Sequence, residues 1–257
     1  QSNKFELNDE DWEVLKKLTI GEGNLDGRGR KPKNLRLSIE GIFWILRTGA
    51  PWRYLPDRYG RWQSLYDRFR IWTQSGLWEH LLEHFHSDLA DLEYVMVDSS
   101  SIRVHQDAAR THRGQSVDAM GRSRGGLTTK LHMACDAPLV TAFFRSDLGE
   151  RADAPQAIGI LRKWIQQSNA CLLDGGYDSD TIREFIVQSS SIAVIPPRQS
   201  RTTQIECDKH LYKERHKVEN LFQRLKQYRS IATRFEKKVT LFAAMIAIAS
   251  ILLWIKF

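Results

Sequence analysis

Two aspartates follow directly after short apolar runs, in a context that could support catalysis. Asp98 follows the run YVMV at 94–97, and Asp174 follows ACLL at 170–173. Such runs have the composition of buried strands. Because ligands bind beyond the carboxyl ends of strands in an open α/β sheet, two carboxylates on neighbouring strands would converge there. Either aspartate alone would also suit a solvated strand end or a helix cap.

A third set of polar residues falls within the stretch YKERHKVENLFQRLK at 212–226. At about 100° per residue, Tyr212, Arg215, Glu219 and Lys226 share one helical stripe about 60° wide. The apolar residues of the stretch fall beside this stripe, where they would dock on the sheet. The alternative interpretation is an ordinary amphipathic helix on which Arg215 and Glu219 form an ion pair four residues apart.

The chain that carries these residues is basic. Its 257 residues hold 38 Lys and Arg against 31 Asp and Glu, a net charge of +7, and 42% of them are apolar. This composition supports a buried core and excludes a disordered tail, whereas the charge favours a polyanionic partner, either nucleic acid or an anionic membrane surface. One basic cluster suits a phosphate-contacting arm and comprises Arg28, Arg30, Lys31, Lys33 and Arg36. A second follows the first aspartate and comprises Arg103, Arg110, Arg113, Arg122, Arg124 and Lys130.

The elements that would position these residues change character near residue 90. Residues 1–90 are predicted to form helices around an aromatic core, which suits a helix-turn-helix reader of DNA or, alternatively, a plain helical domain. Residues 91–257 alternate strands and helices, with an early hairpin, and predict a mixed α/β architecture. The uncharged stretch at 239–255 is predicted to be a buried core helix rather than a membrane span. The three cysteines, without a Cys-x-x-Cys pair, indicate reduced thiols in a cytoplasmic protein.

Four motifs resemble those of a known family and follow one another along the chain in the order that the family has them. The spacing of Tyr212, Arg215, Glu219 and Lys226 is similar to the Tyr-Arg-Glu-Lys signature of bacterial insertion-sequence transposases of the DDE superfamily. The blocks DSSSIRVH at 98–105 and DGGYD at 174–178 resemble the two aspartate blocks of these proteins. The segment GRSRGGLTTKLH at 121–132 resembles the strand motif between them. The likeness extends over residues 12–254.

This resemblance implies a ribonuclease H-like catalytic core over 91–257 and an N-terminal helical DNA-binding domain over 1–90. It implies that Asp98, Asp174 and Glu219 are catalytic and hold Mg²⁺, with Mn²⁺ as a substitute and two ions in each active site. Tyr212, Arg215 and Lys226 would contact phosphates near the cleaved transposon end. Further DNA contacts are expected from the basic clusters, namely Arg28, Arg30, Lys31, Lys33, Arg103, Arg122, Arg124 and Lys130.

The activity implied by the resemblance is metal-dependent hydrolysis of the transposon end, followed by transfer of the freed 3′-hydroxyl to target DNA. The partners would be double-stranded DNA, at the terminal inverted repeats and the target, and a second copy of the chain in a homodimeric DNA complex. We expect no membrane partner and a cytoplasmic location at the nucleoid. Two alternatives stay open: a non-catalytic DNA-binding protein derived from a transposase, and a stand-alone nuclease. Asp178 and Asp180 are assigned to the turn into the next helix and its cap.

Overall fold

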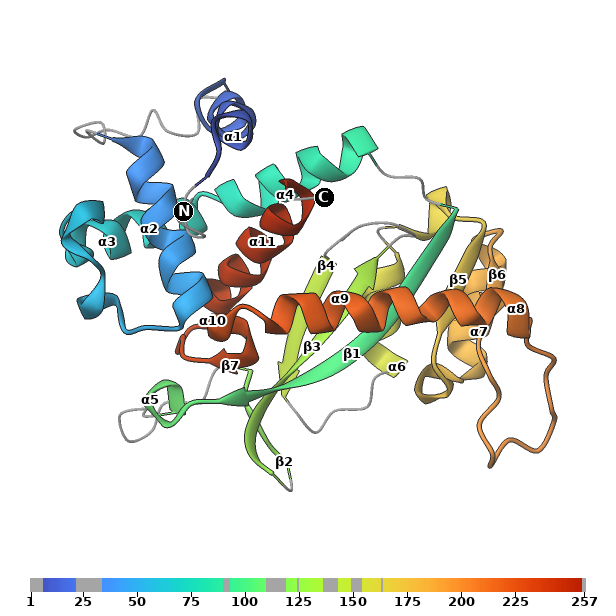
Figure 1. The fold of residues 1–257 in the computed structure, drawn as a ribbon. Helices are drawn as coiled ribbons and strands as arrows, with labels where there is room; N and C mark the ends of the chain where they lie inside the picture. The colour runs from blue at the N-terminus through green and yellow to red at the C-terminus, as the bar shows by residue number, and fades with distance from the viewer. Residues whose placement is uncertain are drawn as a thin grey trace. The chain divides into compact units, whose positions relative to one another are not determined.

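The computed structural model describes residues 7–21, 34–89, 93–109, 119–123, 125–135, 143–148, 154–162 and 164–255. The predicted DNA contacts Arg28, Arg30, Lys31, Lys33 and Arg124 lie outside the described residues. The chain forms two compact units, one of Gln1–Phe85 with Leu225–Phe257 and the other of His86–Arg224. The first unit is helical and the second contains the sheet (Figure 1).

The helical unit begins with four helices, as predicted for residues 1–90. They are α1 (Asp9–Gly21), α2 (Leu35–Thr48), α3 (Trp62–Gln74) and α4 (Leu77–Leu89), with 3₁₀ turns at Trp52–Tyr54 and Asp57–Tyr59. Asn34 caps α2 because its side chain accepts a hydrogen bond from the Leu37 N–H at 3.1 Å. Gly49 ends the same helix in the left-handed region, with φ of 63°.

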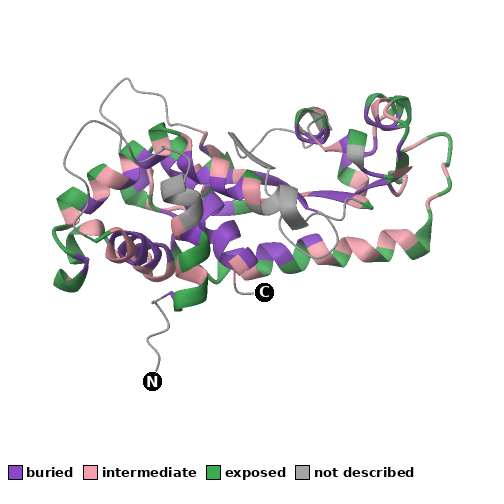
Figure 2. Cartoon of the chain, turned by 90° about the horizontal axis from the view of Figure 1, so that it is seen from above, coloured by how far each residue is buried: buried purple, intermediate pink, exposed green. Residues whose placement is uncertain are grey.

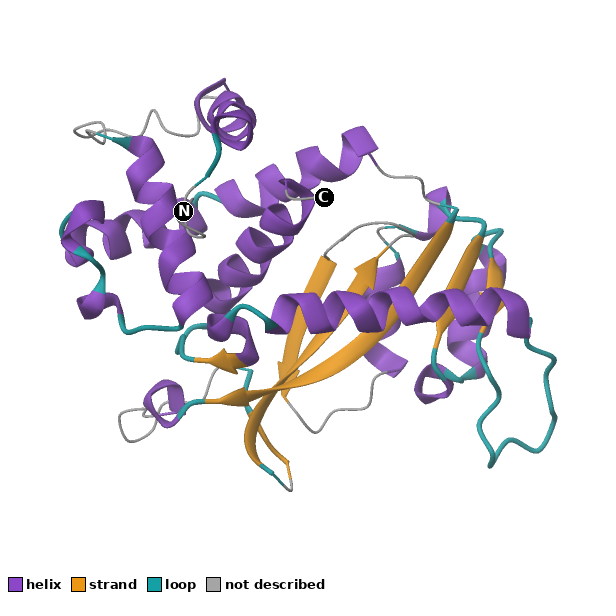
Figure 3. Ribbon diagram, viewed as in Figure 1, coloured by secondary structure: helices purple, strands orange, loops and turns teal. Residues whose placement is uncertain are grey.

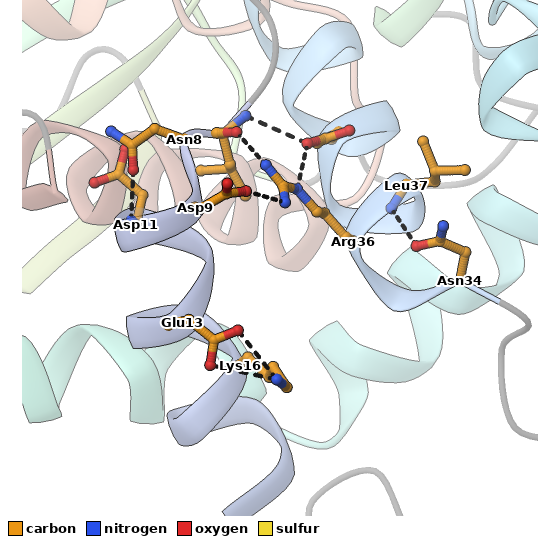
Figure 4. Close-up of polar contacts among 10 residues, drawn as sticks. Asn8, Asp9, Asp11, Glu13, Lys16, Asn34, Arg36 and Leu37 are labelled. Atoms are coloured by element: carbon orange, nitrogen blue, oxygen red, sulfur yellow. Dashed lines mark hydrogen bonds and ion pairs between the residues drawn. The ribbon is translucent and has the colours of Figure 1, made fainter.

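Arg36 ties α1 to α2. Its Nη1 lies 2.6 Å from Asp9 Oδ1, and its Nε lies 3.1 Å from Glu40 Oε1 (Figure 4). Its Nη2 also donates to the Leu7 carbonyl at 2.5 Å. Because Glu40 is buried, its carboxylate needs such a charged partner. Arg36 therefore holds the N-terminal helix in place, in contrast to the phosphate-contacting role that the sequence predicted for it.

The core of the helical unit is completed by the last part of the described chain. After α10 (Arg229–Ala232) and the short strand β7 (Thr233–Arg234), helix α11 (Val239–Ile255) is buried over most of its length and packs with α2 and α3. The apolar composition of α11 therefore reflects core packing, as predicted. Within the ranges that the structure describes, no helix is long and apolar enough to cross a membrane.

Residues 225–257 pack with the N-terminal helices, whereas the sequence pattern grouped them with the segment 91–257. Ser230 Oγ donates to the Ile45 carbonyl at 2.9 Å, and Trp52 Nε1 donates to Glu236 Oε1 at 3.2 Å. The difference has a simple cause. An uninterrupted apolar helix shows that it must be buried, but not against which partner.

The sheet of the second unit has the strand order β2-β3-β1-β5-β6, with β4 also paired to β3 (Figure 3). The strands are β1 (Tyr94–Val104), β2 (Gly121–Ser123), β3 (Gly126–Cys135), β4 (Phe143–Leu148), β5 (Ala170–Leu173) and β6 (Ile192–Val194). Strand β3 is antiparallel to β1, β2 and β4, whereas β5 is parallel to β1 and β6. The predicted mixed architecture is confirmed, and β3 and β4 form the expected antiparallel pair.

Helices cover both faces of this sheet. Helix α9 (His216–Lys226) lies over one face, and α6 (Ala154–Leu161) and α7 (Asp180–Gln188) lie over the other (Figure 1). On the second face, Val95, Val97 and Leu173 belong to one buried apolar cluster with residues of α6 and α7. Figure 2 shows the central strands in the colour of buried residues. The short helices α5 (Gln106–Ala109) and α8 (Lys209–Tyr212) and the 3₁₀ turns Ile165–Gln167, Gly175–Tyr177 and Lys213–Arg215 complete the described elements.

The sequence predicted that strand β1 ends at Asp98. In the structure, β1 continues to Val104. Its parallel pairing with β5 stops at Val97, opposite Leu173. Beyond that point β1 remains paired with β3 as far as Arg103. This cross-strand pairing, rather than burial of side chains, keeps the serines at 99–101 extended. The strand therefore continues here without an apolar sequence pattern.

Candidate active site

Asp98 lies in β1 at the level where the parallel part of the sheet ends. Since Val95 and Val97 face α6 and α7, the alternation of a strand turns Asp98 toward the face that α9 covers. Its side chain is 14% exposed, and its Oδ1 accepts a hydrogen bond from the Ser99 N–H at 2.8 Å. Burial raises the pKa of Asp98, and the charge of Asp174 adds to the rise, although Arg215 and the Ser99 N–H oppose it.

Asp174 reaches the same level from the neighbouring strand. Val97 and Leu173 are paired in parallel register, so the next residues are Asp98 and Asp174. The backbone of Asp174 is still extended, which turns its side chain to the face that Asp98 occupies. Its Oδ1 accepts a hydrogen bond from the Gly176 N–H at 2.8 Å. A Cβ on Gly176 would stand 2.8 Å from the same oxygen, so a larger residue there would displace the carboxylate from its present position.

The third acid, Glu219, comes from α9. Asp208 caps the start of this region by accepting hydrogen bonds from the N–H groups of His210 and Leu211. The helix then tightens into the 3₁₀ turn Lys213–Arg215 before α9 begins, whereas the sequence predicted one continuous helix. His216 Nδ1 lies 2.8 Å from the Lys213 carbonyl and competes for this backbone acceptor at the tightened turn.

Arg215 links the acids of the strand and the helix. Its Nη1 lies 3.0 Å from Asp98 Oδ2, and its Nη2 lies 2.6 Å from Glu219 Oε1. The ring of Tyr212 lies beside it, with the ring centroid 5.9 Å from the guanidinium carbon. Burial lowers the pKa of Arg215, but the neighbouring negative charges outweigh burial and leave the pKa raised. The predicted ion pair between Arg215 and Glu219 is thus present, and a strand carboxylate joins it.

The donor chemistry of these acids fits a hard divalent cation. Carboxylate oxygens are the protein ligands that Mg²⁺ and Mn²⁺ prefer. Asp98 and Asp174 share a face and a level, and the charge of one influences the pKa of the other. The side chain of Glu219 is 52% exposed and pairs with Nη2 of Arg215, whereas Asp98 pairs with Nη1. Accordingly, in the part of the chain that the structure describes, no three His, Cys, Asp or Glu side chains stand close enough to hold a metal.

The remaining predicted DNA contacts are spread over several elements. Arg103 on β1 and Arg122 on β2 are exposed, and Lys130 on β3 is half-buried. Lys226 is exposed in the last turn of α9, within the segment that is grouped with the helical unit. The structure brings together Asp98, Asp174, Tyr212, Arg215 and Glu219.

A hydrogen-bond network surrounds Asp178 that was not predicted from the sequence. This carboxylate is buried, with a side chain 1% exposed, and it accepts hydrogen bonds from Arg183 Nε at 2.8 Å and from the Arg198 N–H at 2.9 Å. Arg201 Nη1 lies 3.4 Å from it. Helix α7 is capped by Ser179, whose Oγ accepts from the Ile182 N–H, and not by either aspartate. No local spacing connects Asp178 with residues twenty positions later, so only the fold reveals the network.

A mixed sheet in this order, covered by helices on both faces, with carboxylates on two adjacent strands and on the covering helix, defines a ribonuclease H-like core. Residues 90–254 match the family model described as "Transposase DDE domain", and residues 7–82 match "Putative transposase of IS4/5 family". The chain belongs to the IS4/5 family of DDE transposases. A DDE transposase domain implies transposase or endonuclease activity, and such proteins use divalent metals.

The relatives of the chain include a protein named as a transposase. A Brucella ovis protein named "Putative transposase for insertion sequence element IS6501" is 36% identical over 134 residues, which are 51% of this chain and 100% of the relative. "Uncharacterized protein y4sN" of Sinorhizobium fredii is 34% identical over 109 residues, 42% of this chain and 85% of the relative. Among solved structures, the chain is similar to a pre-cleavage Mos1 transpososome. The likeness covers 96% of this chain and 84% of the Mos1 chain, with 13% sequence identity and a TM-score of 0.27. A likeness this low carries no argument about the site.

Proposed function

We propose that the protein is an active transposase that binds the terminal inverted repeats of its element, hydrolyses the phosphodiester bond at each end and joins the end to target DNA. The observation that carries the proposal is the meeting of Asp98 and Asp174 at one level of the sheet, with Glu219 linked to Asp98 through Arg215. We propose these three acids as the catalytic residues and metal ligands.

Two Mg²⁺ ions, or Mn²⁺ in their place, would supply the stabilisation of the attacking and leaving oxygens when bound. The chain's own residues provide the rest. The carboxylates of Asp98, Asp174 and Glu219 hold the negative charge that attracts the cations to the sheet edge. Arg215, which pairs with Asp98 and Glu219, has the planar fork that could donate two parallel hydrogen bonds to a phosphate.

DNA binding is proposed for the residues that match the Tyr-Arg-Glu-Lys signature. Tyr212 and Arg215 already lie in contact range of each other beside the acids, and Lys226 follows two helical turns after Glu219. The net charge of +7 supports a polyanionic partner. We propose that residues 1–90 contribute recognition of the repeats, that residues 91–257 contribute catalysis, and that two copies act together on the two ends.

One observation favours the non-catalytic alternative. Glu219 is half-exposed and paired with Arg215, and the acids are not assembled around a common point in the described residues. A DNA-binding protein derived from a transposase could retain this ion pair as a structural contact. The two functions differ in whether the protein cuts DNA, and the proposed catalytic function also requires that cutting depends on Glu219.

Cleavage of labelled duplexes built from the repeats that flank the gene distinguishes them. The wild-type protein is expected to cut at the repeat tip in Mg²⁺ or Mn²⁺, and Glu219→Ala is expected to lose at least about 100-fold of this activity. Glu214→Ala is the matched control, because Glu214 pairs with Lys217 at 2.5 Å and not with Arg215. Binding of the repeats without cutting, by wild type and both variants, would support the non-catalytic function. Cutting without joining of the 3′-hydroxyl end would support a stand-alone nuclease.

A further inference from the structure

The segment after β6 packs against the turn that carries Asp174. Arg198 lies in the connection from β6 to α8 (Figure 1). Its Nε donates a hydrogen bond to the Gly175 carbonyl at 2.9 Å, and its Nη2 donates to the Gly176 carbonyl. One planar guanidinium therefore holds two consecutive carbonyl groups.

The same short turn holds the Asp174 carboxylate. The N–H of Gly176 donates to Asp174 Oδ1, and the Tyr177 N–H donates to the Asp174 carbonyl at 3.0 Å. The peptide group between Gly175 and Gly176 is thus held at both ends, because Arg198 binds its carbonyl and Asp174 binds its N–H. Rotation of this peptide would move the carboxylate oxygen, so the Arg198 contact restricts where that oxygen can lie.

Arg198 is itself anchored from the buried side. The backbone N–H of Arg198 donates a hydrogen bond to Asp178 Oδ2, while Asp178 Oδ1 accepts one from Arg183 Nε. Arg183 Nη2 continues the chain of contacts to the Ile195 carbonyl at 2.7 Å. Because Asp178 is buried, this arrangement is shielded from water, and the backbone of Arg198 has a fixed position from which its exposed side chain reaches the turn.

We infer that Arg198 is a positioning residue for Asp174, acting through the Gly175 and Gly176 carbonyls to hold the carboxylate where a divalent cation binds. The inference rests on the proposed role of Asp174 as a metal ligand. Outer contacts of this kind typically change metal affinity by about 10- to 100-fold. Arg198 touches no reacting group, so its effect reaches the cation only through the turn.

Binding of Mn²⁺ to the full-length, DNA-free protein tests the inference, with free Mn²⁺ measured by electron paramagnetic resonance. Arg198→Ala is expected to weaken binding by about 10-fold or more. Arg198→Lys is expected to weaken it similarly, because an ammonium group keeps the charge but cannot bind both carbonyls as a planar fork. The direction of the change in Mn²⁺ affinity distinguishes positioning from a simple charge effect. If Arg198 acted only as a nearby positive charge, Arg198→Ala would tighten Mn²⁺ binding and Arg198→Lys would leave it unchanged.

The matched control is Arg162→Ala, which removes another exposed arginine after α6 and is expected to leave the affinity unchanged. Thermal melting of each variant shows whether the fold is retained, and since Arg198 is exposed, we expect melting temperatures close to wild type. Unchanged or tighter binding in Arg198→Ala overturns the inference.

Asp174→Asn is measured beside it. If that variant binds Mn²⁺ as wild type does, the proposed role of Asp174 fails, whatever Arg198 does.

Discussion

Burial makes the negative charge of Asp98 unfavourable in the candidate site. Burial raises its pKa even though Arg215 lies 3.0 Å away, so the metal-free protein disfavours the ionised carboxylate that a cation would need. The guanidinium of Arg215, between Asp98 and Glu219, offsets part of this cost. A cation bound beside Asp98 would offset more of it.

Replacing Asp98 by Asn is expected to raise the melting temperature of the metal-free protein at pH 7. A carboxyl whose pKa is raised by folding binds its proton more tightly in the folded state, so stability falls as pH rises from the ordinary value of about 3.9 through the higher folded value. At pH 7 the ionised Asp98 is destabilising, and Asn removes that cost. Below about pH 3.9 the difference should vanish, because Asp98 is then protonated in both states. Melting curves from pH 3 to pH 7.5 check this, and a lower melting temperature for the variant at pH 7 would contradict it.

At the scale of elements, the buried Asp178 joins α7 to the segment that follows β6. Burial would raise the pKa of Asp178, but the Arg198 N–H and the charges of Arg183 and Arg201 outweigh it, so the pKa is lowered. Because the pKa is lowered, the ionised Asp178 and its contacts stabilise the folded state. This stabilisation is present above the ordinary pKa of about 3.9 and is lost as pH falls through the pKa of the folded state.

Asp178→Ala is expected to reduce the free energy of unfolding by about 3–5 kcal/mol at pH 7, because it leaves Arg183 buried without its charged partner. Asp180→Ala is the control. Asp180 also pairs with Arg201, but its side chain is 75% exposed, so its loss should cost no more than about 1 kcal/mol. Urea unfolding of both variants measures the difference. Equal losses would show that burial of Asp178 does not determine its contribution.

The elements were largely predictable from the sequence, and the contacts between distant elements were not. Uninterrupted apolar runs predicted α11 at its observed limits and also predicted β5, because a buried helix is a long apolar run and a buried strand a short one. The same pattern ended β1 too early, since the serines after Asp98 are held by pairing with β3. The helical stripe correctly placed Arg215 beside Glu219, but the third partner, Asp98, lies more than a hundred residues earlier. Arg198 was missed for the same reason.

At the scale of the whole molecule, the chain builds its helical unit from two separate stretches, Gln1–Phe85 and Leu225–Phe257. Helix α11 supplies buried residues that α2 and α3 pack against. A chain that stops after Lys238 should therefore lose amide protection in α2 and α3, while β1, β3 and β5 keep theirs. Hydrogen exchange measured by mass spectrometry checks this, with a chain that stops after Ile255 as the control. Retained protection in α2 would contradict a shared core.

The two-stretch helical unit has a consequence for how the protein emerges from the ribosome. Helices α2 and α3 are synthesised early, but their packing partner α11 follows only after the entire sheet-containing unit. At about 5–20 residues per second, this interval is on the order of ten seconds, during which the apolar sides of α2 and α3 have no α11 to cover them. The nascent chain should depend on chaperones during that interval, and the sheet-containing unit should be the first part to acquire its native structure.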